Sequence, residues 1–209
     1  MGISATDERV YEKRLIENKK DIYLNNNVLD KYINDKGYKE KVDIIKNYLE
    51  RCNVKQYILD IGSNTSGESE ILFHLGYKMI PTDINEIALS ISKKRSKYFR
   101  NEELVYFASD AHNIPVADNT FEFIIAFEVL HHMENVNDVV SELYRVLLPG
   151  GHLFTFDPYA FNPYRKIAEF RDYFKGTIEK SFSIRKLKNI LKVNGFEIIN
   201  INKRRCDRV

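Results

Sequence analysis

The sequence predicts a Rossmann-like α/β fold, with a doubly wound, mostly parallel sheet and helices on both faces. From residue 57 onward, short β-rich runs alternate with longer helical stretches, which is typical of α/β domains. Most of these runs are apolar enough to be covered on both faces, as parallel strands are. A chain of 209 residues is long enough for one well-cored domain.

The strands are expected where β-branched and aromatic residues gather between turn signals. In chain order, the predicted strands are Tyr57–Ile61, Lys78–Thr82, Leu104–Ser109, Phe121–Phe127, His152–Phe156 and Phe196–Asn202.

Helices are predicted between the strands, and the residues at their ends agree. Asn85, Asn135 and Ser183 are good N-caps, and glycines at 150 and 195 are stop signals. The predicted helices are Glu68–Leu75, Glu86–Tyr98, Val136–Leu147 and Ile184–Val193.

Two parts of the chain stand outside this alternation. Residues 1–50 are predicted to be a helical, amphipathic extension ahead of a domain that spans residues 51–209. Residues 158–182 form a Pro-containing, aromatic and basic insertion that is much longer than the usual connection of about 2–6 residues. We expect this insertion to be functional.

Composition and charge exclude several classes of protein. The net charge of +2 is no electrostatic footprint for nucleic acid, although residues 151–209 carry 13 basic and 6 acidic groups. Cys52 and Cys206 lie far apart, which indicates neither a metal site nor a disulfide framework and favours a cytoplasmic location. No apolar stretch approaches the ~20 residues that span a bilayer, so no integral membrane contact is expected.

A turn of unusual composition follows the first predicted strand. The strand ends in Asp60 and Ile61, and the residues Gly62 to Gly67 then lead into a helix. Such a turn lets the backbone approach a ligand closely and aims helix N–H groups at it. Alone, the pattern is equally consistent with a tight turn that binds nothing.

Acidic residues end two further strands. Asp83 follows the second strand about 20 residues after the turn, where a carboxylate can accept both hydroxyl hydrogens of a ribose. Asp110 follows the third strand, where a carboxylate can accept from an exocyclic adenine amine. An aspartate after a strand is also a common cap, but three successive ones favour an adenosine ligand.

The segment after the third strand resembles the class I S-adenosylmethionine-dependent methyltransferases, in particular their small-molecule, type 11-like group. From Asp110 to Pro158 it reads DAHNIPVADNTFEFIIAFEVLHHMENVNDVVSELYRVLLPGGHLFTFDP. The resemblance covers roughly residues 55–157, together with the NGFEI run at 194–198. Order, spacing and strand context all agree with the family.

The resemblance implies an S-adenosylmethionine site, with S-adenosylhomocysteine as the product. In the family, such a site has a methionine-side loop, residues that hold the ribose and the adenine, and residues that border the cofactor. The corresponding positions in this sequence are Asp60, Gly62, Ser63, Asn64, Gly67, Asp83, Ile84, Asp110, Ala111, Phe127 and Glu128. The loop departs from the family's three-glycine pattern, because Asn64 and Ser66 stand at its second and third glycine positions. Asn tolerates the left-handed conformation well, whereas Ser66 is less easily accommodated. The family's final antiparallel strand is missing or formed by the tail.

His131 and His132 follow the fourth strand on the side where an acceptor would lie. A histidine there could act as a general base, since it is poised near neutral pH. Packing or capping is the competing interpretation. Methyl transfer from a sulfonium depends mainly on proximity and orientation, so a dedicated base is optional.

The sequence therefore predicts an enzyme that methylates an O, N or C atom of a small molecule. The insertion 158–182 is the candidate acceptor lid, and its basic residues could pair with an anionic acceptor. One alternative is a non-catalytic module that binds adenosylmethionine or a partner. Another is a nicotinamide oxidoreductase, which the absence of a G-x-G-x-x-G fingerprint disfavours.

Overall fold

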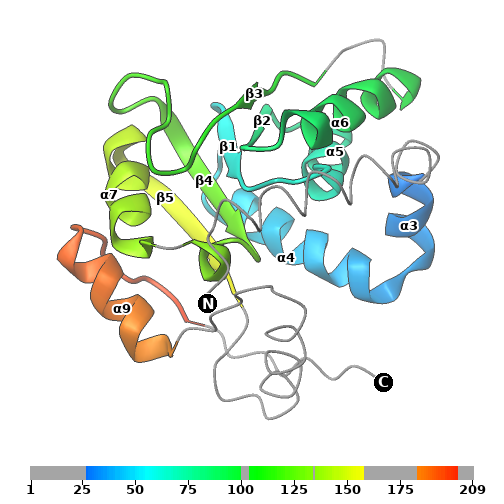
Figure 1. The fold of residues 1–209 in the computed structure, drawn as a ribbon. Coiled ribbons are helices and arrows are strands. Elements are labelled where there is room, and N and C mark those ends of the chain that lie inside the picture. Colours follow the sequence, from blue (N-terminus) through cyan, green and yellow to red (C-terminus); the bar gives the residue numbers. More distant parts are fainter. Residues whose placement is uncertain (1–26, 100–103, 134, 158–182, 202–209) are drawn as a thin grey trace, which may run out of the picture.

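The centre of the molecule is a five-stranded parallel sheet (Figure 1). The structure is a computed structural model that describes residues 27–99, 104–133, 135–157 and 183–201. The strands lie in the order β3-β2-β1-β4-β5. Their bounds are β1 Ile58–Ile61, β2 Met79–Asp83, β3 Phe107–Ala108, β4 Phe121–Phe127 and β5 Leu147–Phe156.

The strand order places a ligand-binding edge in the middle of the sheet. The chain runs outward from β1 to β3 and then crosses back to β4 on the other side of β1. Open α/β sheets bind ligands outside the carboxyl ends of their strands, at the point where the order reverses. In this molecule that point lies between the ends of β1 and β4.

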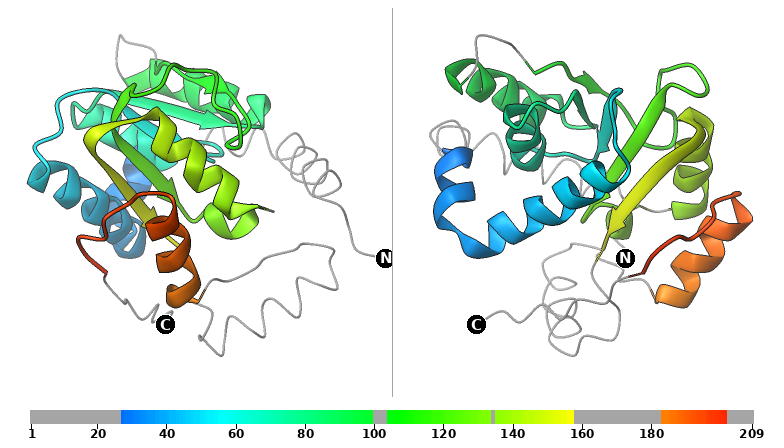
Figure 2. Two further views of the ribbon diagram at one scale, coloured as in Figure 1. Left: turned by 90° about the vertical axis from the view of Figure 1, so that its left-hand side faces the viewer. Right: turned by 180° about the vertical axis from the view of Figure 1, so that it is seen from behind.

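Helices cover both faces of the sheet, which confirms the predicted fold class (Figures 1 and 2). Helices α4 and α5 lie on one side and α7 on the other, as the two views in Figure 2 also show. The helices are α3 Val28–Asn34, α4 Lys36–Arg51, α5 Gly67–His74, α6 Glu86–Phe99, the 3-10 helix η1 Leu130–His132, α7 Val136–Val146 and α9 Ile184–Val193.

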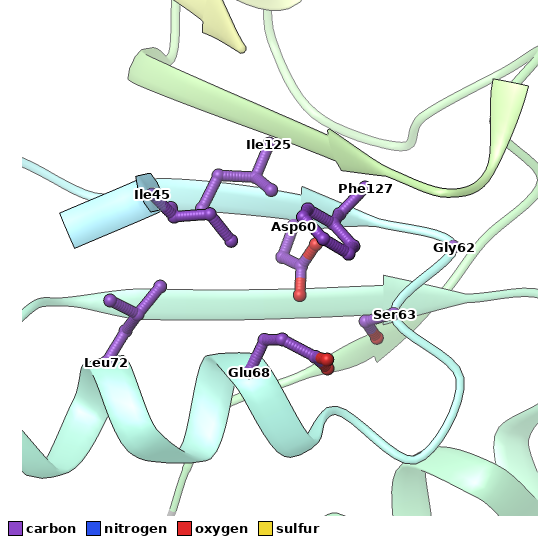
Figure 3. A pocket seen from close by; sticks show the side chains of 8 residues that line it. All are labelled: Ile45, Asp60, Gly62, Ser63, Glu68, Leu72, Ile125 and Phe127. Atoms are coloured by element: carbon purple, nitrogen blue, oxygen red, sulfur yellow. The ribbon is translucent and has the colours of Figure 1, made fainter. Parts of the chain in front are cut away.

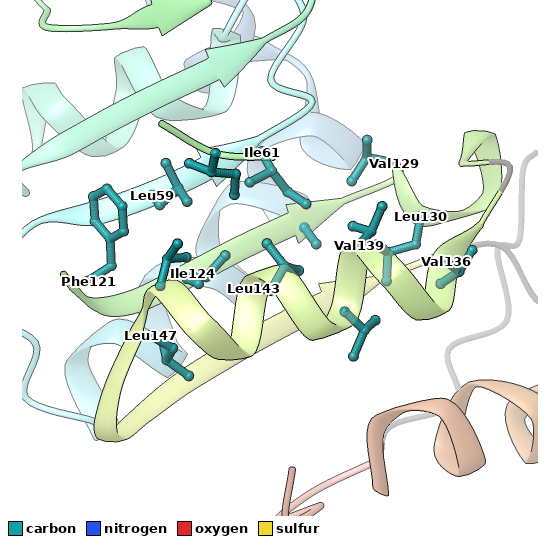
Figure 4. Close-up of a cluster of buried hydrophobic side chains, with 14 residues drawn as sticks. Leu59, Ile61, Phe121, Ile124, Val129, Leu130, Val136, Val139, Leu143 and Leu147 are labelled. Carbon is teal, nitrogen blue, oxygen red and sulfur yellow. The ribbon is translucent and has the colours of Figure 1, made fainter. Parts of the chain in front are cut away.

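One half of the core lies between the sheet and α7 (Figure 4). Apolar residues of α7 recur at helical spacing, so one stripe of the helix faces the strands. Val139, Val140 and Leu143 are fully buried there against Leu59 and Ile124 of the central strands. Helix α9 adds partly buried leucine and isoleucine side chains to the same cluster.

The other half of the core lies between the sheet and the N-terminal helices. Val42, Ile45 and Leu49 of α4 are fully buried, and they belong to the same cluster as Ile58 and Phe123. Helix α4 therefore shares the core of the sheet. The division of the chain at residue 50 stays a prediction.

Two strand predictions need correction. The third strand pairs only at Phe107–Ala108, and Val105 before it is 64% exposed. The described residues 196–201 form no strand. None of these residues pairs with a strand of the described sheet, and Ile199 is 79% exposed, so the apolar run lacks a second covered face.

The fifth strand begins earlier than predicted. Phe121 pairs with Leu147 and Phe123 with His152, so the strand carries an irregularity between these two pairs. Gly150 has a positive φ of 78° at this irregularity. The sequence marked it as a helix stop signal, but it lies inside the strand.

Some predictions fall on residues that the structure does not describe. The insertion 158–182, Cys206 and residues 1–26 of the extension lie outside the described ranges. In the part of the chain that is described, no helix combines the length and apolar character needed to cross a membrane.

Candidate functional site

A small pocket lies at the carboxyl end of β1, where the strand order reverses (Figure 3). Its volume is about 30 Å³, and it includes Asp60, Gly62, Ser63 and Phe127 of the predicted site. Its other lining residues are Ile45, Glu68, Leu72 and Ile125. Sequence reasoning and geometry thus converge on one edge of the sheet.

Asp60 is the buried carboxylate of the pocket. The Ser69 hydroxyl of α5 donates a 2.6 Å hydrogen bond to its Oδ2. Burial raises the pKa of Asp60 to about 7, and the neighbouring Glu68 and Asp83 act in the same direction. Burial likewise raises the pKa of Glu68, which sequence analysis did not select. Both carboxylates point into the pocket in Figure 3, which suits a cationic ligand.

The turn between β1 and α5 is held in a left-handed conformation at three positions. Gly62 has φ 60°, and Asn64 and Ser66 have φ 49° and 53°. Asn64 and Ser66 therefore adopt a conformation that glycine takes most easily. The Ser63 and Ser66 hydroxyls lie 3.0 Å apart, and the Ser66 N–H donates to the Ser63 carbonyl at 2.7 Å.

Asp83 joins this turn to the second strand. Its Oδ2 accepts a 2.8 Å hydrogen bond from the Asn64 N–H, and its Oδ1 accepts one from the Asn85 N–H. Each carboxylate oxygen keeps a further lone pair for a ligand hydroxyl. In the structure, Asp83 therefore fixes the turn between β1 and α5.

The predicted adenine-side residues lie toward β3. The Asp110 Oδ1 accepts a 3.0 Å hydrogen bond from the His112 N–H and lies 2.7 Å from the His112 Nδ1. The Ser109 N–H donates to the Asp83 carbonyl at 3.0 Å, which ties this segment to β2. Ile84 is 44% exposed and Ala111 is half-buried. Neither Asp110 nor Ala111 lines the pocket itself.

Helix α4 closes one side of the pocket, which sequence reasoning missed. The Lys41 ammonium lies 3.1 Å from Glu128 Oε2 and 5.5 Å from the centre of the Phe127 ring. Tyr38 packs over Gly67, where an added Cβ would lie 2.7 Å from the Tyr38 hydroxyl. That hydroxyl is buried, and it has no hydrogen-bond partner among the described residues.

The two histidines differ in their surroundings. His131 is buried, and its Nδ1 lies 2.9 Å from Oδ1 of Asp157, which directly follows β5. The His131 N–H donates to the same oxygen at 3.2 Å. His132 is exposed, although its ring lies 4.0 Å from that of His131. Asp157 stands at the carboxyl end of its strand, as Asp83 and Asp110 stand at the ends of theirs, so the same rule could have identified it.

A pH-dependent stability is expected from Asp60. Because the pKa of Asp60 in the folded protein lies above its ordinary value, the unfolded chain loses this proton first as pH rises. The free energy of unfolding should therefore fall between about pH 4 and pH 7. Asp60→Asn removes this contribution. As pH rises from about 4 to 7, the melting temperature of this variant should therefore fall less than that of the wild type. Equal pH dependence in thermal melts of the two proteins would contradict the assignment.

Comparison with known proteins identifies the domain around this site. Residues 59–155 match a family described as a methyltransferase domain. Over 100 residues the chain is 29% identical to the ubiquinone/menaquinone biosynthesis C-methyltransferase UbiE of Desulfotalea psychrophila, covering 48% of this chain and 40% of the relative. Over 154 residues it is 30% identical to the sterol 24-C-methyltransferase ERG6 of Saccharomyces cerevisiae, covering 68% and 39%. The chain thus spans about two fifths of the length of these relatives.

Solved structures show the same fold. A SAM-dependent methyltransferase from Archaeoglobus fulgidus superposes with a TM-score of 0.60 at 21% identity, covering 75% of this chain and 69% of the other. The YcgJ protein from Bacillus subtilis gives a TM-score of 0.65 at 19% identity, covering 75% and 68%.

Proposed function

Since the chain belongs to the class I S-adenosylmethionine-dependent methyltransferases, we propose that it transfers a methyl group from S-adenosylmethionine to an O, N or C atom of a small molecule. When bound, the cofactor supplies an electrophilic methyl group on a positively charged sulfur and leaves as S-adenosylhomocysteine. The observation that carries this proposal is the edge shared by β1, β2 and β4. There the chain brings together a tight turn, a buried carboxylate and a strand-end aspartate.

The residues at this edge fit such a ligand in chemistry. Asp60 and Glu68 offer carboxylates to the cationic groups of the methionine end. Asp83 would accept the ribose hydroxyls, with Ile84 beside it, and Asp110 with Ala111 would hold the adenine. The remaining border of the site would come from Gly62, Ser63, Asn64, Gly67, Phe127 and Glu128.

The pocket can hold only part of a ligand of this size, since Asp83 and Asp110 lie outside it. A volume of about 30 Å³ holds only one or two water molecules. Ile45 lines the pocket from α4, and the Lys41–Glu128 pair joins the same helix to the end of β4. Helix α4 therefore borders the site on this side.

His131 is the proposed general base of the reaction. Asp157 fixes the orientation of its ring through Nδ1, which leaves Nε2 to take a proton from the acceptor. His131→Gln should lower kcat by about 10²- to 10⁴-fold while S-adenosylhomocysteine affinity stays within a few-fold. The exposed neighbour provides the matched control, because His132→Gln should keep most of the rate. Equal losses in initial rate for both variants would contradict the assignment.

The acceptor is proposed to be a small molecule, and an anionic one is supported by the basic residues of 158–182. Names of relatives mention ubiquinone/menaquinone biosynthesis, sterol and phosphoethanolamine as methylation contexts. These relatives are carbon and nitrogen methyltransferases, so the acceptor atom of this chain stays open. The acceptor lid at 158–182 stays a prediction. A cytoplasmic location without a nucleic-acid partner is supported by the charge balance and cysteine usage.

A non-catalytic module that binds the same cofactor is the second candidate. The observation that favours it is Ser66, which replaces a glycine of the family's loop and stands in a left-handed conformation. Such a module would bind the cofactor without turnover.

One experiment separates catalysis from binding alone. The protein is incubated with a metabolite extract and S-adenosylmethionine that carries a deuterated methyl group, and the products are analysed by mass spectrometry. The proposal predicts a small molecule that gains the labelled methyl group only when active protein is present. Binding of the cofactor with no labelled product would favour the non-catalytic module.

A further inference from the structure

The turn of residues 62–67, called the cofactor loop from here on, has the Thr65 carbonyl between two strained residues. Thr65 separates Asn64 and Ser66, which both adopt positive φ values that side chains disfavour. Strained conformations of this kind persist only where the surrounding structure fixes them.

Two buried donors from α6 hold the Thr65 carbonyl. The Ser92 hydroxyl donates to it at 2.5 Å, and the Arg95 Nη2 donates to it as well. Ser92 is fully buried and Arg95 is 2% exposed. Neither residue lines the pocket, so both donors contact the loop from outside the pocket.

Glu70 fixes the Arg95 side chain from α5. The Arg95 Nε lies 3.0 Å and its Nη2 2.7 Å from Glu70 Oε1, and Glu70 is fully buried. One guanidinium group therefore links the loop, the helix that follows it and the next helix. A lysine could keep the charge but not this planar fork.

The same loop also holds the predicted ribose carboxylate. The Asn64 N–H donates to Asp83 Oδ2 at 2.8 Å, so a displaced Asn64 would release one side of that carboxylate. Hydrogen bonds at Thr65 and Asn64, which are adjacent in the chain, thus connect Arg95 to Asp83.

We propose that Arg95, assisted by Ser92, is a positioning residue that keeps the cofactor loop in its binding conformation. The hydrogen bonds from Arg95 and Ser92 form a buried clamp that holds the left-handed residues of this loop in place. In the family's usual loop, glycines adopt that conformation without a steric penalty. This inference rests on the proposed function. The inference adds an explanation of how a loop that contains Asn64 and Ser66 keeps the conformation that binds the cofactor.

The test measures S-adenosylhomocysteine affinity by titration calorimetry on variants of the full chain. Arg95→Lys keeps a positive charge beside Glu70, and it should weaken binding about tenfold. Ser92→Ala removes one donor and should weaken binding about three- to fivefold. Lys94→Ala, at an exposed position of the same helix, is the control and should bind like the wild type.

Rescue distinguishes positioning from general stability. Asn64→Gly together with Ser66→Gly should restore most of the affinity lost in Arg95→Lys, because glycines adopt the loop conformation without the clamp. The same two glycines in the wild-type background give the reference affinity against which the rescue is measured. If Arg95→Lys fails to fold, the rescue is measured on Ser92→Ala. Unchanged affinity in both variants, or no rescue by the glycines, would overturn the proposal.

Hydrogen exchange keeps the two proposals apart. In Arg95→Lys, amide exchange in residues 62–67 should speed up relative to the wild type, with or without ligand. Exchange that stays unchanged would refute the clamp. A wild-type protein that fails to bind S-adenosylhomocysteine would instead refute the proposed function.

Discussion

Gly62→Ala is expected to lower the free energy of unfolding by about 2–5 kcal/mol. A Cβ at this position would lie 2.0 Å from Val129 Cγ2 and 2.9 Å from its Cβ. Val129 is buried behind the end of β4 and cannot move outward without opening the core. The positive φ of 60° adds strain for any residue that carries a side chain.

Gly76→Ala is the matched control for this change. Gly76 also has a positive φ, of 99°, but a Cβ there would meet nothing within 4 Å. Urea denaturation of the two variants therefore separates the clash from the backbone strain. A Gly62→Ala protein that is no less stable than Gly76→Ala would show that the turn does not require close packing.

Asp83→Ala should weaken S-adenosylhomocysteine binding by about 10- to 150-fold, since it removes charge-assisted hydrogen bonds to the ribose worth about 1.5–3 kcal/mol. The loss should exceed the cost to stability. Some stability is nevertheless lost, because the carboxylate also accepts from the Asn64 and Asn85 N–H groups. Calorimetric titration and a thermal melt on the same sample measure both effects.

Two further variants define the cause of that loss. Asp83→Asn keeps one acceptor oxygen for the backbone donors, so it should preserve more stability than affinity. Glu86→Ala removes an exposed carboxylate in the first turn of α6 and should leave affinity unchanged. An unchanged dissociation constant in Asp83→Ala would place the ribose site elsewhere.

The sheet was predictable where apolar runs are continuous. Phe121–Phe127 forms a strand with the predicted bounds, because its residues are covered on both faces. The predicted helix at Ile184–Val193 is also confirmed, and Ser183 caps it through the Lys186 N–H. Local pattern is sufficient in these segments because their burial follows from their own periodicity.

The errors occurred where pairing depends on a neighbour. Residues 104–109 are apolar enough for a strand, yet only Phe107 and Ala108 meet partners on β2. Residues 196–201 contain three isoleucines but have no neighbouring strand in the described sheet. An apolar run cannot by itself show whether such a partner exists.

The site could be predicted only in part for a related reason. Strand ends identified Asp60 and Asp83, because parallel strands bring their carboxyl ends to one edge. Arg95 lies in the run KKRSK, which has the composition of a solvated helix face, and its burial depends on Glu70 of another helix. Lys41 reaches Glu128 across 87 positions of sequence. No local pattern marks such contacts.

Ligand-dependent thermal stability tests the central claim most directly, since only a ligand that binds the folded state raises the melting temperature. At 100 times its dissociation constant, S-adenosylhomocysteine should stabilise the protein by about 2.7 kcal/mol, whereas NAD at the same concentration should leave the melting temperature unchanged. A clear shift with NAD and none with S-adenosylhomocysteine would contradict the assignment of this sheet edge as an S-adenosylmethionine site.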